Sequence, residues 1–193
     1  SDTKANSAIY YLTNTNKGYT YSFSASLQKH FDFGLDIMAA YTFGHAYSLN
    51  DGTSSQAKSS WGKNYTTNSN SPALTYSLFD IPHRFIARVS YTKRYARYFG
   101  STLSLVYECH SGQRYTLGYT DKADTNGDGY YSNSPLYIPT DKELTAMTFT
   151  DIKNGMTADE QRGAFRKYIL ADDYMKNHRG QFTERNGSQA PFE

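Results

Sequence analysis

The sequence predicts an all-β fold: a segment of an antiparallel transmembrane β-barrel with long extracellular loops and one short loop helix. Three observations lead to this prediction. Apolar and polar residues alternate over runs of nine or more residues, aromatic residues gather toward the ends of those runs, and short turns alternate with very long connections. Tilted membrane strands need about ten residues, whereas strands in soluble proteins usually have roughly five or six.

The composition is short of aliphatic residues for an ordinary core. Hydrophobic residues make up 38% of the 193 residues, and the chain contains 19 Tyr and 11 Phe. A tyrosine ring is apolar with a polar tip, so it suits a boundary between hydrocarbon and water better than a dry interior. The sequence has no run of about eighteen apolar residues, which excludes a transmembrane helix, and no signal-peptide pattern.

Charge and cysteine content exclude two further classes of protein. The formal net charge of +2 comes from 20 basic and 18 acidic residues that are scattered along the chain, so nothing favours nucleic-acid binding. Cys109 is the single cysteine, which excludes an intrachain disulfide framework.

The first hairpin is expected at about residues 18–48, around a turn at Asp32–Gly34. One face of each strand is apolar and the other is rich in Ser and Thr. The apolar residues in chain order are Tyr19, Tyr21, Phe23, Ala25 and Leu27, then Leu35, Ile37, Ala39, Tyr41 and Phe43.

The second hairpin is expected at about residues 84–117, with its turn near 97–100. Its apolar face is formed by Phe85, Ala87, Val89 and Tyr91, then Leu103, Leu105 and Tyr107. Arg84 and Arg88 fall on the opposite face, where we expect them to pair with Glu108 and Asp36 on neighbouring strands.

The alternation alone also fits a soluble antiparallel sandwich or solenoid with one wet face. Strand length, aromatic placement and loop asymmetry favour the membrane interpretation, in which the apolar face contacts lipid and the serine face lines the lumen. Backbone groups in hydrocarbon must all be paired, and four strands cannot close a barrel. The chain is therefore expected to be a fragment of a larger barrel or one part of an assembly.

The first long loop, at about 49–83, is rich in Ser, Thr, Asn and Gly. It contains Trp61, the single tryptophan, which is the one candidate for substrate binding; a loop anchor or a membrane-interface residue is the alternative. No other substrate-binding residue can be assigned from the sequence.

The second long loop, at about 118–193, contains half of a calcium-binding pattern. The candidate ligands are Asp124, Asn126, Asp128, the Tyr130 carbonyl and Ser132, with Asp121 as a further carboxylate. Position twelve is Pro135 instead of a bidentate Glu, so a polar turn closed by Gly127 and Gly129 is the alternative.

The same loop carries the expected helix, and the sequence contains no catalytic pattern. Thr157 and Glu160 have capping-box spacing, Phe165, Tyr168, Ile169 and Asp172 follow on one side, and Gly180 is the expected stop. The five histidines are dispersed, and no nucleophile elbow or phosphate loop is present, so we expect no enzyme.

The chain resembles the C-terminal part of a TonB-dependent outer-membrane receptor of the Bacteroidetes type, in the Oar-like group with a carboxypeptidase-regulatory-like extension. The matching pieces are "NTNKGYTYSFSASLQKHF", "AAYTFGHAYSLNDGTSSQA", "FDIPHRFIARVSY", "DTNGDGYYSNSPLYIP" and "YILADDYMKNHRGQFTERNGSQAPFE". They cover nearly the whole chain.

The resemblance implies a plugged barrel of about 22 strands in the bacterial outer membrane. The implied partners are the rest of the barrel, the plug domain, outer-membrane lipid and the TonB complex acting through the plug, and whether a surface lipoprotein joins them is left open. The implied function is uptake of a nutrient, with a peptide or protein slightly preferred. The resemblance also implies that Arg185–Gly187 orders the path into a closing strand. Two other functions stay open: a passive or structural barrel such as an adhesin, and a soluble surface module that binds calcium.

Overall fold

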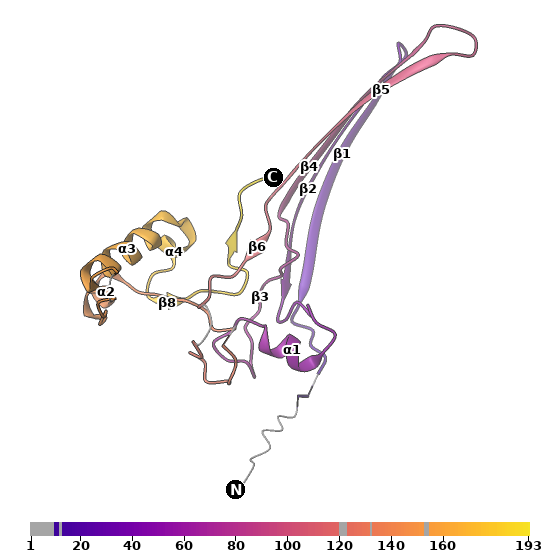
Figure 1. Ribbon diagram of the computed structural model, residues 1–193. Coiled ribbons are helices and arrows are strands. Elements are labelled where there is room, and N and C mark those ends of the chain that lie inside the picture. Colours follow the sequence, from indigo (N-terminus) through magenta and orange to yellow (C-terminus); the bar gives the residue numbers. More distant parts are fainter. Residues whose placement is uncertain (1–9, 12, 120–122, 132, 153–154) are drawn as a thin grey trace.

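The computed structural model describes residues 10–11, 13–119, 123–131, 133–152 and 155–193, and it is rich in β-structure (Figure 1). The four long strands are β1 (Tyr19–Phe31), β2 (Leu35–Ser48), β4 (His83–Arg94) and β5 (Gly100–His110). The short strands are β3 (Thr75–Tyr76), β6 (Arg114–Tyr115), β7 (Tyr137–Ile138), β8 (Gln181–Phe182) and β9 (Ser188–Gln189). The helices are α1 (Ala57–Gly62), α2 (Asp141–Ala146), α3 (Ala158–Ala171) and α4 (Asp173–Asn177).

The long strands form one antiparallel sheet in the order β1-β2-β4-β5, and β3 adds to β2. Among the four long strands the register pairs odd-numbered residues with odd-numbered residues, for example Ile37 with Val89 and Val89 with Leu105. Directly opposed side chains in a sheet lie on the same face, so the apolar residues of all four strands share one face. The expected alternation is therefore confirmed across both hairpins.

The polar face is held by cross-strand hydrogen bonds between hydroxyl groups. The oxygen–oxygen distances are 2.9 Å for Ser24 and Thr42, 2.8 Å for Ser90 and Ser104, and 2.9 Å for Thr92 and Thr102. Small hydroxyl residues on this face thus pair with one another directly across the strands.

The apolar face of the sheet is exposed. Phe23, Leu27 and Leu103 have 68%, 74% and 78% of their surface accessible, and Tyr21, Ile37 and Phe85 are also exposed. A soluble sandwich would bury these side chains against a second layer, because their removal from water is the main source of its stability. The described residues provide no such layer over them.

Aromatic side chains frame this apolar face at both ends. Tyr47 stacks between Tyr19 and Tyr76 at the loop end, with ring centroids 4.9 and 4.8 Å apart, and Phe31 contacts Phe33 at the turn end. The ten residue-to-residue steps from Tyr21 to Phe31 span about 33 Å along a strand. At a tilt of about 40° this is a height of about 25 Å, the size of the apolar band of outer-membrane barrels.

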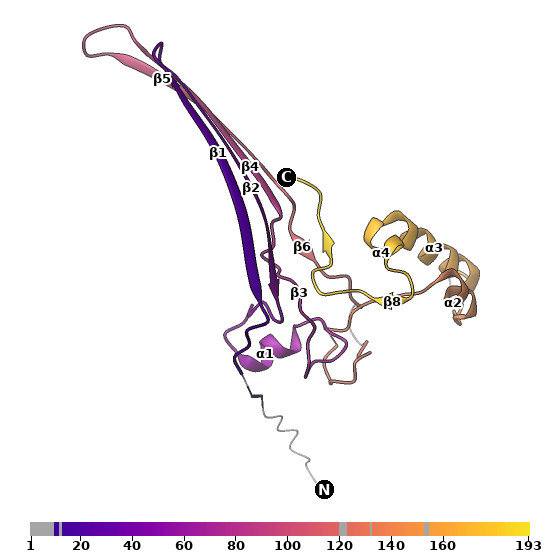
Figure 2. The ribbon, with the colours of Figure 1, turned by 180° about the vertical axis from the view of Figure 1, so that it is seen from behind.

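Both short turns lie at one end of the sheet, and the long connections lie at the other end (Figures 1 and 2). The first turn closes through a 2.9 Å hydrogen bond from the Gly34 amide to the Phe31 carbonyl. Gly34 has φ +92°, and a Cβ there would lie 2.1 Å from the Thr92 carbonyl oxygen, so this tight turn requires glycine.

The second long loop folds around a small hydrophobic core of its own. Ile138, Ile169 and Met175 are fully buried, and Leu117, Leu136, Phe165 and Tyr174 pack against them. Helices α2, α3 and α4 surround this core and stand apart from the sheet in both views (Figures 1 and 2). None of the helices in the described ranges has the length and apolar character that a membrane crossing requires.

The helix predictions were partly wrong. The capping box of Thr157 and Glu160 is present and starts α3, but the described residues contain four helices instead of one. The helix ends at Ala171 and not near Gly180, because the Asp172 side chain accepts a hydrogen bond from the Met175 amide and starts α4. Ala171 and Asp172 therefore form a corner between two helices.

The C-terminal segment pairs with the chain beyond β5. The amides and carbonyls of His110 and Glu193 exchange hydrogen bonds of 3.0 and 2.9 Å, and β9 pairs with β6. The second hairpin thus ends at His110 instead of near residue 117, and residues 188–193 run antiparallel to 110–115.

Candidate functional site

A pocket of about 910 Å³ lies at the loop end of the sheet, and Trp61 of α1 forms part of its wall. The segment that precedes β1, including Tyr10, forms a second part of the wall, and the residues just after β2 form a third. The sequence singled out Trp61 and the Asp124–Ser132 segment separately. The structure brings both to this pocket, because Asp128 also lines it.

Trp61 is held between two tyrosine rings. The ring centroids of Tyr10 and Tyr130 are each 5.4 Å from that of Trp61, at interplanar angles of 67° and 73°. The hydroxyl groups of Tyr10 and Tyr130 are 3.1 Å apart and hydrogen-bonded. A Cβ at Gly62 would lie 2.3 Å from the Tyr130 ring, so glycine lets this ring pack directly on α1. We call Tyr10, Trp61 and Tyr130 the aromatic cluster.

The Asp124–Tyr130 segment forms polar turns stabilised by its own carboxylates. The two Asp124 oxygens accept hydrogen bonds from the backbone amides of Asp128 at 3.0 Å and Gly129 at 2.9 Å. Gly127 and Gly129 have φ angles of +70° and +82°, as the turn alternative expected. Ser132 and Asp121, which the calcium prediction also included, lie outside the described residues.

Within the described part of the chain, no group of three or more His, Cys, Asp or Glu side chains is arranged to hold a metal ion. The side-chain oxygen of Asn126 accepts a hydrogen bond from the Asp128 amide at 3.3 Å, and Asp128 accepts one from the Tyr130 amide at 2.8 Å. The oxygens of the first calcium positions thus take part in the internal bonding of the turn. Calcium binding stays a prediction.

Asp128 joins the two long loops. Its carboxylate accepts hydrogen bonds from the Ser69 hydroxyl in the first loop and from the Asn133 amide group in the second, the latter at 2.6 Å. Burial alone would raise the pKa of Asp128, but the hydrogen bonds from Ser69, Asn133 and the Tyr130 amide outweigh it and lower the pKa. Asp128 is therefore ionised at neutral pH.

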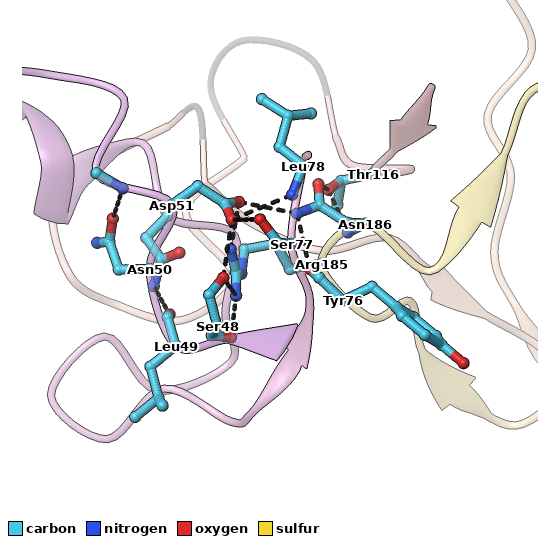
Figure 3. Close-up of polar contacts among 12 residues, drawn as sticks. Ser48, Leu49, Asn50, Asp51, Tyr76, Ser77, Leu78, Thr116, Arg185 and Asn186 are labelled. Atoms are coloured by element: carbon cyan, nitrogen blue, oxygen red, sulfur yellow. Dashed lines mark hydrogen bonds and ion pairs between the residues drawn. The ribbon is translucent and has the colours of Figure 1, made fainter. Parts of the chain in front are cut away.

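A second cluster, which we call the Asp51 junction, ties the first long loop to the C-terminal segment (Figure 3). Asp51 pairs with Arg185 and accepts hydrogen bonds from the hydroxyls of Ser48 and Ser77 and the side-chain amide of Asn186, at 2.8, 2.8 and 2.9 Å. The Leu78 backbone amide adds a further donor at 3.1 Å.

The ion pair of the Asp51 junction is almost fully buried. The side chains of Asp51 and Arg185 are 8% and 5% exposed. Burial would raise the pKa of Asp51, but the Ser48 hydrogen bond, the Arg185 charge, and the Ser77 and Asn186 hydrogen bonds together lower it. Asn186, at φ 56°, also donates to the Tyr76 carbonyl at 2.9 Å. Arg185 and Asn186 therefore fix the chain just before it runs beside β6 and the end of β5.

A neighbouring buried pair supports the same region. Asp80 is 1% exposed, accepts a 2.8 Å hydrogen bond from Arg114, and lies 3.2 Å from the His45 ring nitrogen. The Arg114 guanidinium lies 3.8 Å from the centroid of the Tyr76 ring, a cation–π contact. This cluster links β2, β3 and β6.

The charges on the polar face follow the prediction in part. Arg84 pairs with Glu108 at 2.6 Å, as expected. Asp36 instead lies 2.6 Å from a ring nitrogen of His30, and Arg88 stands opposite Met38 and Val106 in the register. His30 on β1 is directly opposite Asp36 in the register, so its side chain is closer to the Asp36 carboxylate than that of Arg88.

The sequence reasoning did not find Tyr10, Asp51, Asp80 or Arg114. Their partners are distant in the chain, and no local spacing marks them.

The pocket supplies aromatic faces and hydrogen-bonding groups, which are suited to noncovalent binding. Comparisons with protein families, curated proteins and solved structures find no match to this chain.

Proposed function

We propose that the chain is the C-terminal barrel segment of a TonB-dependent receptor that takes up a nutrient across the bacterial outer membrane. The observation that carries the proposal is the exposed apolar face of the four long strands, framed by aromatic side chains at both ends. Hydrocarbon is the surrounding in which such a face is stable, and aromatic rings prefer the two membrane interfaces.

The opposite face supports the same assignment. It carries serine and threonine side chains and the Arg84–Glu108 pair, which suit a water-filled lumen or contact with a plug domain. Short turns at one end and long loops at the other agree with the usual asymmetry of outer-membrane barrels, where the long loops are extracellular. The pocket at Trp61 then opens on the extracellular side.

Closure of the barrel requires further strands. In the described part of the chain, β1 and β5 are the edges of the sheet, and backbone groups at such edges must be paired within hydrocarbon. Pairing of residues 188–193 with 110–115 directs the C-terminal segment toward the free edge of β5. The rest of the barrel, the plug and the TonB complex are the proposed partners, as the sequence resemblance implies.

Arginine substitutions on the two faces of β1 test the proposal. Phe23→Arg places a charge on the proposed lipid face and should destabilise the membrane-folded protein by about 2–4 kcal/mol if the site is near the midplane. Ser24→Arg, one residue away on the other face, is the matched control and should have a much smaller effect. Folding into lipid vesicles, followed by urea titration, measures both. Equal tolerance at the two positions would contradict a lipid-facing apolar side.

Active uptake separates this function from a passive barrel. Solute uptake by cells that carry the protein should stop when a protonophore removes the inner-membrane proton gradient. Uptake that continues without the gradient would favour a passive pore.

A further inference from the structure

The pocket at Trp61 has a lining that indicates the class of its ligand. We infer that it binds a neutral oligosaccharide, with one sugar ring laid against Trp61 and hydroxyl groups bonded to amide side chains of the pocket walls. This inference rests on the proposed function, since it names the substrate class of that receptor.

The aromatic cluster supplies the stacking surface. A sugar ring has faces lined by C–H groups and a rim of hydroxyls, so it matches an aromatic face that is apolar and has polar groups at its edge. Trp61 is fixed from two sides by Tyr10 and Tyr130, and these two are hydrogen-bonded to each other. A ring that is already held in place loses little conformational entropy when a ligand stacks on it.

The pocket walls supply neutral hydrogen-bonding groups. Asn14 lies in the segment before β1 and Asn70 in the loop after α1, and both line the pocket. Within the described residues, neither side chain makes a hydrogen bond, and both are exposed. A side-chain amide carries both donors and acceptors, which is what a hydroxyl group needs from its partner.

The charge of the pocket argues against an ionic ligand. Its charged side chains are Lys17 and Asp128, one of each sign. The Asp128 carboxylate is occupied by Ser69, Asn133 and the Tyr130 amide. A multiply anionic ligand such as a ferric chelate would be expected to meet a cluster of Arg or Lys, which this lining lacks.

The size of the pocket indicates more than one sugar ring. Its volume of about 910 Å³ is near the upper limit of the roughly 300–1,000 Å³ typical of small-ligand sites. The aliphatic contribution is limited to a few residues such as Leu49, Ala57 and Pro72. This lining offers little aliphatic surface to apolar peptide side chains, so an oligosaccharide suits it better than the peptide that the sequence resemblance favours.

Calorimetric titration of the intact protein in detergent tests the inference. The probes are maltohexaose, cellohexaose and chitohexaose as neutral saccharides, an uncharged hexapeptide of Gly, Ala, Ser and Asn, and ferric citrate. We expect at least one saccharide to bind, and Trp61→Ala to raise its Kd about tenfold or more. Trp61→Phe should retain most of the affinity because a ring remains.

Two further variants separate the pocket from a general loss of folding. Tyr168→Ala removes an exposed ring on α3, outside the pocket, and should leave the saccharide Kd unchanged. Asn70→Ala changes an exposed residue of the pocket wall and should raise the Kd about fivefold, the effect of one lost hydrogen bond of about 1 kcal/mol. It serves as the test if Trp61→Ala does not fold.

The outcomes distinguish this inference from the proposed function. Binding of the peptide or of ferric citrate without any saccharide would overturn the inference while the receptor function stands. Failure of every probe to bind the folded protein, or saccharide binding that neither Trp61→Ala nor Asn70→Ala weakens, would also overturn it. Saccharide binding by a protein that folds without detergent and tolerates Phe23→Arg would support the inference and refute the membrane receptor.

Discussion

The Asp51 junction gives the sharpest test of how the loops are held. Asp51→Ala and Arg185→Ala each remove one partner of a buried ion pair whose side chains are 8% and 5% exposed. Removing one member of such a pair typically costs about 3–5 kcal/mol, because the other is left buried without its counter-charge.

The two substitutions should not be equivalent. After Arg185→Ala, the Asp51 carboxylate keeps four donors, from Ser48, Ser77, Asn186 and the Leu78 amide. After Asp51→Ala, all of these donors and Arg185 lose their common acceptor. We therefore expect Arg185→Ala near 3 kcal/mol and Asp51→Ala near 5 kcal/mol, each as a rough value.

Trp61 provides the readout. Its helix α1 is connected to the junction, because the Asn50 side chain donates to the Ser60 carbonyl at 3.0 Å next to Asp51. Urea unfolding in detergent, followed by tryptophan fluorescence, gives the free energy of loop unfolding for each variant. Asp159→Ala is the control: Asp159 pairs with Arg162 but is 89% exposed, so its loss should change stability by at most about 0.5 kcal/mol.

The reasoning would be refuted by either of two results. Equal unfolding free energies for Asp51→Ala and Asp159→Ala would show that the buried pair does not stabilise the loops. A larger effect of Arg185→Ala than of Asp51→Ala would show that the carboxylate is not the common acceptor.

Three other predictions concern the same loops. The pKa of Asp51 in the folded protein lies below its unfolded value of about 4, so the stabilisation by the Asp51 carboxylate is present above about pH 4 and is lost as pH falls through the folded pKa. The urea midpoint should drop in that pH range, and it should drop less in Asp51→Asn. Calcium binding at the Asp124 turn should raise the urea midpoint in calcium above that in chelator, and Asp128→Ala should abolish the rise; equal midpoints would instead favour a turn closed by its own hydrogen bonds alone. Ile169→Ala should destabilise the α2–α4 core by about 2–5 kcal/mol, with faster hydrogen exchange in residues 136–182 and unchanged exchange in β1 and β2, whereas faster exchange throughout would mean one cooperative unit.

The sequence predicts the sheet well because the alternation of apolar and polar residues is a local pattern. Side chains alternate with a period of two, so residues such as Phe23 and Ser24 reveal their faces without knowledge of any distant partner. The hairpin turns are similarly marked by Gly34 and Gly100. The predicted end of the second hairpin lies beyond the end of β5. Residues 110–115 pair with the C-terminal segment instead of continuing the hairpin.

The site depends on contacts that a local pattern cannot show. Asp51 and Arg185 are separated by 134 residues, and Tyr10 and Tyr130 by 120. Their pairing follows from how the two loops fold together. One further element does carry a local pattern: Thr140 and Glu143 form the same capping box as Thr157 and Glu160, and they start α2.

The separate core of α2–α4 bears on how this surface can diversify. Its buried centre, Ile138, Ile169 and Met175, shares no residue with the four long strands. Mutations on the outer side of these helices therefore leave the strand register unchanged. Mutations in the four long strands likewise leave the helical core unchanged. The lobe can therefore change its sequence without a compensating change in the sheet.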